Sequence, residues 1–187
     1  MSKYIGFTLI EILVSLAILL SVLAIGIPSL NNFIVSMRVD NEIYQIRRLI
    51  LLSRNSAINA STKVTLCPLD EENKCVNSWH DTLSVFTDIN SNKVFEPLIN
   101  ERMLAQKAEI KQGDILRYGT TRIGLTYEET GRLFGWGQNA TFSYCPANHS
   151  DKNRGIIVAI SGRSYASTGN KNDTFNIRRT GKKITCG

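Results

Sequence analysis

The sequence lacks the residue constellations on which most enzymes depend. Its 187 residues include only two histidines, His80 and His149. We find no defensible grouping of Ser, His and Asp, of Cys and His, or of paired carboxylates. No glycine-rich loop that could cradle a phosphate occurs either. We therefore expect a protein that is not an enzyme and that needs no cofactor.

Metal-binding patterns are also missing. The cysteines do not follow a C-x-x-C spacing, and neither histidine sits beside a cysteine pair, which argues against zinc. The segment 88–92 (DINSN) begins like a calcium loop, but Lys93 and Ile99 stand where such loops carry glycine and an acidic residue. A polar hairpin turn explains the segment better, so we expect no metal site.

Charge is too scarce, and hydrophobic residues too frequent, for a disordered chain: the two classes make up 20% and 43% of the residues. Residues 150–187 hold eight basic and two acidic side chains, which accounts for the whole net charge of +6. The excess predicts a basic pole on an otherwise neutral body, and such a pole suits an anionic partner.

One long hydrophobic run stands near the start. Residues 7–27 contain Glu11 as their only charge, and as a helix they would span about 31 Å, the thickness of a bilayer core. The run is too long for a cleaved signal peptide. Apolar spacing continues in steps of three and four along positions 39, 43, 46, 50, 53 and 57. We predict one helix over 7–60 whose second half packs on a sheet.

Short alternating runs follow residue 60 and predict antiparallel strands. Aromatic side chains at 79, 86, 134 and 136 are expected in the core. The predicted strands cover residues 63–69, 83–87, 115–118, 123–127, 132–136, 141–144, 155–160 and 175–178.

Gly6-Phe7-Thr8-Leu9-Ile10-Glu11 resembles the processing motif of type IV prepilins and pseudopilins. The resemblance implies that a prepilin peptidase cuts after Gly6 and that Phe7 becomes the methylated N-terminus. It also implies that Glu11 pairs with the terminal amine of a neighbouring subunit, and a carboxylate within an apolar helix does need such a counter-charge.

Further matching stretches lie at residues 54–57, 64–67, 79, 85–88, 141–145 and 155–163. On these the chain resembles the FimT/GspH family of minor pilins and pseudopilins, most closely its FimT branch. The resemblance implies an α+β, type IV pilin-like fold, in which a long N-terminal helix packs on a small antiparallel β-sandwich. The implied segments are a leader (1–6), a transmembrane and filament-core helix (7–29), an amphipathic helix (30–60) and a sandwich with a basic C-terminal region (61–187).

Four cysteines, Cys67, Cys75, Cys145 and Cys186, lie beyond the apolar run, and export would favour their oxidation. Three pairings are possible. We favour Cys67–Cys75, which closes a short loop, together with Cys145–Cys186, which would hold the basic tail on the sandwich.

The FimT resemblance implies binding of DNA for uptake in natural transformation. The family's Gly-Arg-x-Arg motif falls on Gly162, Arg163, Ser164 and Tyr165, so its second arginine is absent. A tyrosine can stack on a base but supplies no charge. The expected DNA-binding residues are Arg163, Tyr165, Lys171, Arg178, Arg179, Lys182 and Lys183.

The expected partners are double-stranded DNA contacted through its phosphates, other major and minor pilins, the prepilin peptidase and the inner membrane. We expect a single-pass inner-membrane protein with a periplasmic domain, which is later incorporated into a pilus at the cell surface. Three alternatives stay open: a minor pilin that primes or caps pilus assembly, a type II secretion pseudopilin, and a basic face that docks on an acidic pilin or is merely solvated.

Overall fold

The computed structural model describes residues 6, 8–135, 137, 139–169, 176–177 and 183–186. It divides into two units, residues 1–37 and 38–187, which are described separately. The helix α1 (Leu9–Ala60) begins in the first unit and ends in the second, close to the predicted 7–60. It contains a window of mean hydropathy 2.7 that is wholly exposed, and by length and composition it could cross a membrane.

The second half of α1 is amphipathic, as its spacing predicted. Ile46, Ile50, Ser53 and Ala57 are fully buried, whereas Tyr44 on another face is 68% exposed. Period-3.6 spacing puts these buried positions on one stripe, and this stripe supplies the helical part of the core.

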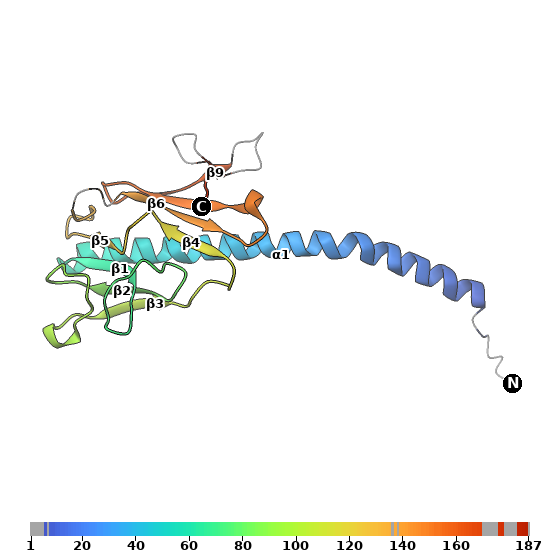
Figure 1. Ribbon diagram of the computed structural model, residues 1–187, viewed down its shortest axis with the longest axis horizontal. Helices are drawn as coiled ribbons and strands as arrows, with labels where there is room; N and C mark the ends of the chain where they lie inside the picture. Colours follow the sequence, from blue (N-terminus) through green and yellow to red (C-terminus); the bar gives the residue numbers. More distant parts are fainter. Residues whose placement is uncertain are drawn as a thin grey trace. The chain divides into compact units, whose positions relative to one another are not determined.

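The strands form two antiparallel four-stranded sheets, which lie beside the second half of α1 (Figure 1). The first sheet has the order β3-β2-β1-β5, and the second has the order β4-β6-β7-β8. The strand bounds are β1 Val64–Pro68, β2 Leu83–Thr87, β3 Met103–Lys107, β4 Ile115–Tyr118, β5 Leu125–Tyr127, β6 Ala140–Cys145, β7 Arg154–Val158, β8 Ser164–Ala166, β9 Thr168–Gly169 and β10 Asn176–Ile177. Strands β9 and β10 pair with each other, and the short 3₁₀ helices η1 (Pro97–Ile99) and η2 (Ser150–Lys152) complete the described elements.

Aromatic rings from the second sheet fill the core. The Tyr118 and Phe142 rings stack with centroids 4.2 Å apart, and Trp79 meets both rings edge-on. All three side chains are at most 1% exposed. A separate cluster on the first sheet gathers Phe86 and the disulfide of Cys67 and Cys75.

The strand predicted at 132–136 is wrong. Only Leu133 forms a bridge, to Tyr127, and the predicted core residue Phe134 is 37% exposed. Gly131 and Gly135 have φ angles of +75° and +86°, which are incompatible with an extended strand. Trp136 lies outside the described residues.

The segment 88–92 is a polar turn, as expected, but it starts from a buried carboxylate. Asp88 is fully buried and accepts a hydrogen bond from Thr65 Oγ1 at 2.7 Å. Burial raises the pKa of the nearby Glu101 carboxyl, although backbone N–H groups of Ile89 and Glu96 donate to it. Within the described part of the chain, no cluster of His, Cys, Asp and Glu could hold a metal ion.

Candidate functional site

The candidate site lies on the side of the second sheet that faces away from the core. Strand β4 alternates exposed and buried positions, with Arg117 exposed and Tyr118 buried. Because directly opposed strand residues share a face, the register aligns Arg117 with Ser143 and then Gly155. The next row runs from Thr141 through Ile157 to Tyr165. We call this side the outer face.

Tyr165 is 42% exposed on this face. The turn that precedes it presents Arg163, which is exposed and whose backbone carbonyl accepts a hydrogen bond from Ala159 N at 2.9 Å. Two predicted DNA-binding residues are thus solvent-accessible, and they lie two positions apart.

Gly162 fixes the conformation of this turn. Its φ is +77°, and an added Cβ would lie 1.9 Å from the carbonyl oxygen of Gly131. The Tyr127 hydroxyl also donates to the Gly162 carbonyl. Only glycine fits here, so close packing of two loops sets the position of Arg163.

A groove of about 640 Å³ opens on the outer face. Arg117 and Arg122 line it together with Thr121, Asn139, Thr141 and Ser143, and none of the described residues in its lining is acidic. Neither arginine forms an ion pair with any other described residue. The groove is therefore suited to an anion.

The backbone at Arg122 is anchored from the core side. The indole Nε1 of the buried Trp79 donates to the Arg122 carbonyl at 2.6 Å. The side chain passes close to Gly119 and Gly137, where an added Cβ would lie 3.0 Å from Cγ and Nη2 of Arg122, respectively. Both glycines have positive φ, so the surrounding loops leave room for the guanidinium group.

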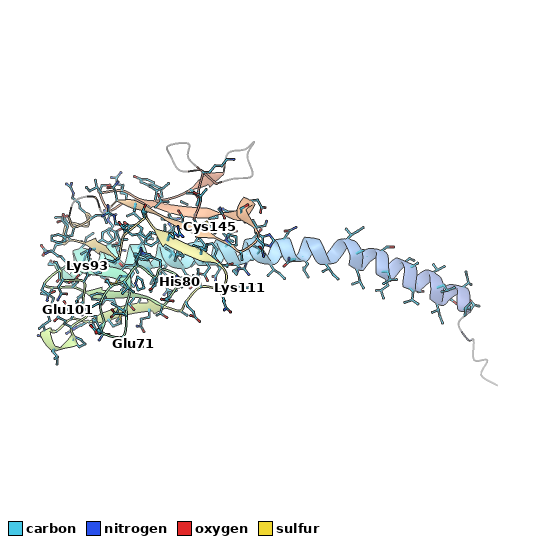
Figure 2. All side chains as sticks on the ribbon, in the orientation of Figure 1. Glu71, His80, Lys93, Glu101, Lys111 and Cys145 are labelled. Carbon is cyan, nitrogen blue, oxygen red and sulfur yellow. A yellow bond between two sulfur atoms is a disulfide. The ribbon has the colours of Figure 1, made fainter. Side chains whose placement is uncertain are left out.

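The C-terminal segment lies along the outer face. Cys186 is bonded to Cys145, which Figure 2 labels on the second sheet. Asn153 Nδ2 donates to the Ile184 carbonyl at 3.1 Å. An added Cβ on Gly155 would lie 2.8 Å from Ile184 Cδ1, so the absence of a side chain there allows the segment to pack closely. Cys186 also lines the groove.

Both favoured disulfides are present. Cys67 and Cys75 are eight residues apart, and Cys145 and Cys186 are 41 apart; no described cysteine is free. His80 is exposed, and His149 is half-buried.

The other predicted basic residues are only partly described. Lys183 is exposed next to the buried Ile184. Lys171, Arg178, Arg179 and Lys182 lie outside the described residues. Sequence reasoning missed Arg117 and Arg122; the alternation of β4 could have placed Arg117 on a solvent face, but nothing local pointed to a groove.

At the N-terminal end, Thr8 and Glu11 form a reciprocal cap. Glu11 N donates to Thr8 Oγ1 at 3.4 Å, and Thr8 N donates to Glu11 Oε2 at 3.5 Å. This is the capping-box arrangement, which satisfies free N–H groups at a helix start. Gly6 is exposed just before it, and Phe7 lies outside the described residues.

A long apolar helix packed on antiparallel sheets, preceded by Gly6 and bearing Glu11, defines a type IV pilin-like protein. Residues 1–27 match the prokaryotic N-terminal methylation motif, and residues 42–162 match the family described as type II transport protein GspH. The chain belongs to the GspH family, whose members include minor pilins and pseudopilins. No curated protein matches it.

Two crystal forms of one solved protein share this fold. The type IV minor pilin FimU of Pseudomonas aeruginosa, in one crystal form, is 14% identical, with 73% of this chain and 95% of FimU covered and a TM-score of 0.56. A second crystal form of FimU gives 14% identity, coverages of 73% and 99% and a TM-score of 0.54. The minor pseudopilin EpsH of Vibrio cholerae is 14% identical, with coverages of 69% and 95% and a TM-score of 0.48. The helix and motif fit membrane anchoring and incorporation into a pilus.

Proposed function

We propose that this minor pilin binds extracellular DNA without sequence preference, for uptake in natural transformation. The observation that carries the proposal is that the basic region 150–187 begins and ends on one sheet. Its start contributes β7 and β8, and its end is fastened back to β6 by Cys186. Of the eight basic side chains in this region, Arg163 and Lys183 are described as exposed, and the same sheet exposes Tyr165.

Phosphate contacts explain how such a surface would work. Lys and Arg side chains that neutralise phosphates release condensed counterions, which gives affinity independent of sequence. A receptor for uptake has no need to read bases, so backbone contacts suffice. Arg163 offers a fork of donors to a phosphate, and Tyr165 offers a ring on which a base can stack.

Maturation belongs to the same proposal. We expect cleavage after Gly6, methylation of Phe7 and pairing of Glu11 with a neighbour's terminal amine. In the single chain, Glu11 already accepts from the backbone of Thr8. The carboxylate would therefore exchange a weak, exposed cap for an ion pair when the subunit enters a filament.

The test is a titration of duplex DNA with the full-length protein in a nonionic detergent at several salt concentrations. With at least four phosphates engaged, log K should fall with log salt at a slope of about −3.6 or steeper. Changing Arg163, Arg178 and Arg179 to Ala should make the slope shallower by about 2.7, which is about 0.9 for each lost contact. The matched control changes the exposed Arg47, Arg48 and Arg102 to Ala and should leave it intact. No binding at low salt, or equal effects of the two triple variants, would refute DNA binding by the tail.

A structural role in assembly is the second candidate, as a minor pilin that primes or caps a pilus or as a type II secretion pseudopilin. It is favoured by an uncovered apolar strip on α1, where Tyr44 and Leu51 are 68% and 42% exposed. Tyr44, Leu51 and Arg47 line a hollow of about 430 Å³. A deletion strain that makes no pili would support this role, whereas one that keeps its pili but loses DNA uptake would support the first.

A further inference from the structure

We infer that the groove on the outer face holds a stretch of the DNA backbone, with Arg117 and Arg122 as its phosphate-binding residues. This deepens the proposed function and rests on it. The two arginines lie outside the basic tail in sequence, since both precede residue 150 and residues 1–149 have no net charge, although Thr185 and Cys186 of the tail also line the groove. It would therefore add contacts to those of the tail.

Charge is the first support. The described residues of the lining contribute two guanidinium groups and no side-chain carboxylate. Its other polar side chains are hydroxyls and one amide, including Thr121, Thr141 and Asn139, all of which can donate hydrogen bonds to phosphate oxygens. Such a set of donors suits a phosphodiester, whose oxygens are all acceptors.

The second support is that the groove adjoins the exposed ring of Tyr165. Ile157 lines the groove and lies directly opposite Tyr165 in the β7–β8 ladder. The two side chains therefore project from the same side of the sheet. A strand whose phosphates contact Arg117 and Arg122 could place a base against the Tyr165 ring, and aromatic stacking accepts any base. DNA offers a flat base beside every phosphate for this ring to stack on, whereas an acidic side chain has no such face, which is why we favour DNA.

Arg122 is held in place before any ligand arrives. Its carbonyl is bound by Trp79, and its side chain runs past two glycines that leave it space. The anchored backbone has little freedom left to lose when the guanidinium group binds a phosphate. The groove is also bounded by Cys186, so the disulfide that fastens the tail helps to shape it.

The test replaces Arg117 and Arg122 with Gln in the full-length protein and repeats the salt titration with DNA. With two groove contacts added to four in the tail, the wild-type slope should be about −5.4, and the double variant should return it to about −3.6. At 0.1 M salt each lost contact weakens binding about eightfold, which gives about sixtyfold for the pair. The control changes the exposed Arg47 and Arg102 to Gln.

The outcomes separate the two proposals. If the wild type binds DNA and the groove variant behaves like the control, the groove inference is wrong while DNA binding by the tail survives. If the wild type does not bind at all, both fail. A variant with Arg117→Lys and Arg122→Lys keeps the charges and should keep the slope. It shows whether the Gln variant loses binding through its lost charge. If polyglutamate of equal charge competes as well as DNA and loses affinity in the same variants, the groove is a protein-docking site and the DNA assignment is overturned.

Discussion

Removal of the Cys145–Cys186 disulfide tests the link between the tail and the sheet. The perturbation is Cys145→Ser with Cys186→Ser, so that no lone thiol remains. The bond closes a loop of 41 residues, and the chain-entropy relation gives about 4 kcal/mol of stabilisation for that length. The same relation gives about 2.5 kcal/mol for Cys67–Cys75, which closes eight residues. The longer loop should therefore be the costlier one to open.

The assay is equilibrium unfolding in urea, followed through the near-ultraviolet circular dichroism of the packed aromatic core around Trp79. We expect the Cys145 and Cys186 double variant to lose more unfolding free energy than the Cys67 and Cys75 double variant. It should also bind DNA more weakly, because Ile184 and Cys186 would no longer be held on the outer face. Equal losses, or a loss below about 1 kcal/mol for the longer loop, would refute the reasoning, because a structured unfolded state would then have cancelled the entropy term.

Three further predictions concern single side chains. Gly155→Ala should cost about 1–3 kcal/mol in urea unfolding and weaken DNA binding, because the new methyl would meet Ile184 Cδ1 at 2.8 Å; an unchanged stability would mean that the tail shifts freely. Asp114→Asn should cost about 3 kcal/mol in the same assay, since the buried carboxylate pairs with Arg38 at 3.1 Å; Arg102→Gln is the control. Carbon-13 NMR should find the pKa of Glu101 above the ordinary range for glutamate, because burial raises it. A raised pKa favours the folded state at low pH, so this group's contribution should be fully present below the unfolded pKa and be lost as pH rises through the folded one; a pKa at or below the ordinary range would contradict this.

The helix was readable from the sequence because its period was repeated many times. The buried positions 46, 50, 53 and 57 are those that the spacing selects. Strands β2 and β4 were also predicted with their observed bounds, since both are short apolar-rich runs between polar turns. Strand β3 (Met103–Lys107) was missed, because its sequence MLAQK has no β-branched residue. Pairing with β2 makes it a strand, and this tertiary contact leaves no local signal.

The candidate site was likewise predictable only in part from the sequence. Gly162 and Arg163 could be found because they belong to one short motif, and the fold explains the glycine by its approach to Gly131. Arg117 and Arg122 could not be found, since they stand more than 40 residues earlier in the chain. Only the register from β4 through β6 and β7 brings their groove beside the row of Tyr165.

Residues 1–149 contain equal numbers of basic and acidic side chains, but these are unevenly distributed over the structure. Two of these acidic groups form ion pairs between α1 and the residues that pack on it. Asp114 pairs with Arg38, and Glu42 pairs with the buried Lys107 at 2.7 Å. The two charges of a close ion pair largely cancel each other at a distance. These carboxylates therefore do not offset the charge of arginines elsewhere on the surface, and the paired Arg38 and Lys107 do not add to it.

The outer face carries Arg117 and Arg122, and no acidic residue is among the described residues that line the groove. The disulfide fastens Cys186, at the end of the basic tail, beside these two arginines. This is why the predicted salt slope depends on both regions. It is also why tail and groove variants, made together, should weaken DNA binding by about the product of their separate effects if the two regions bind separate phosphates.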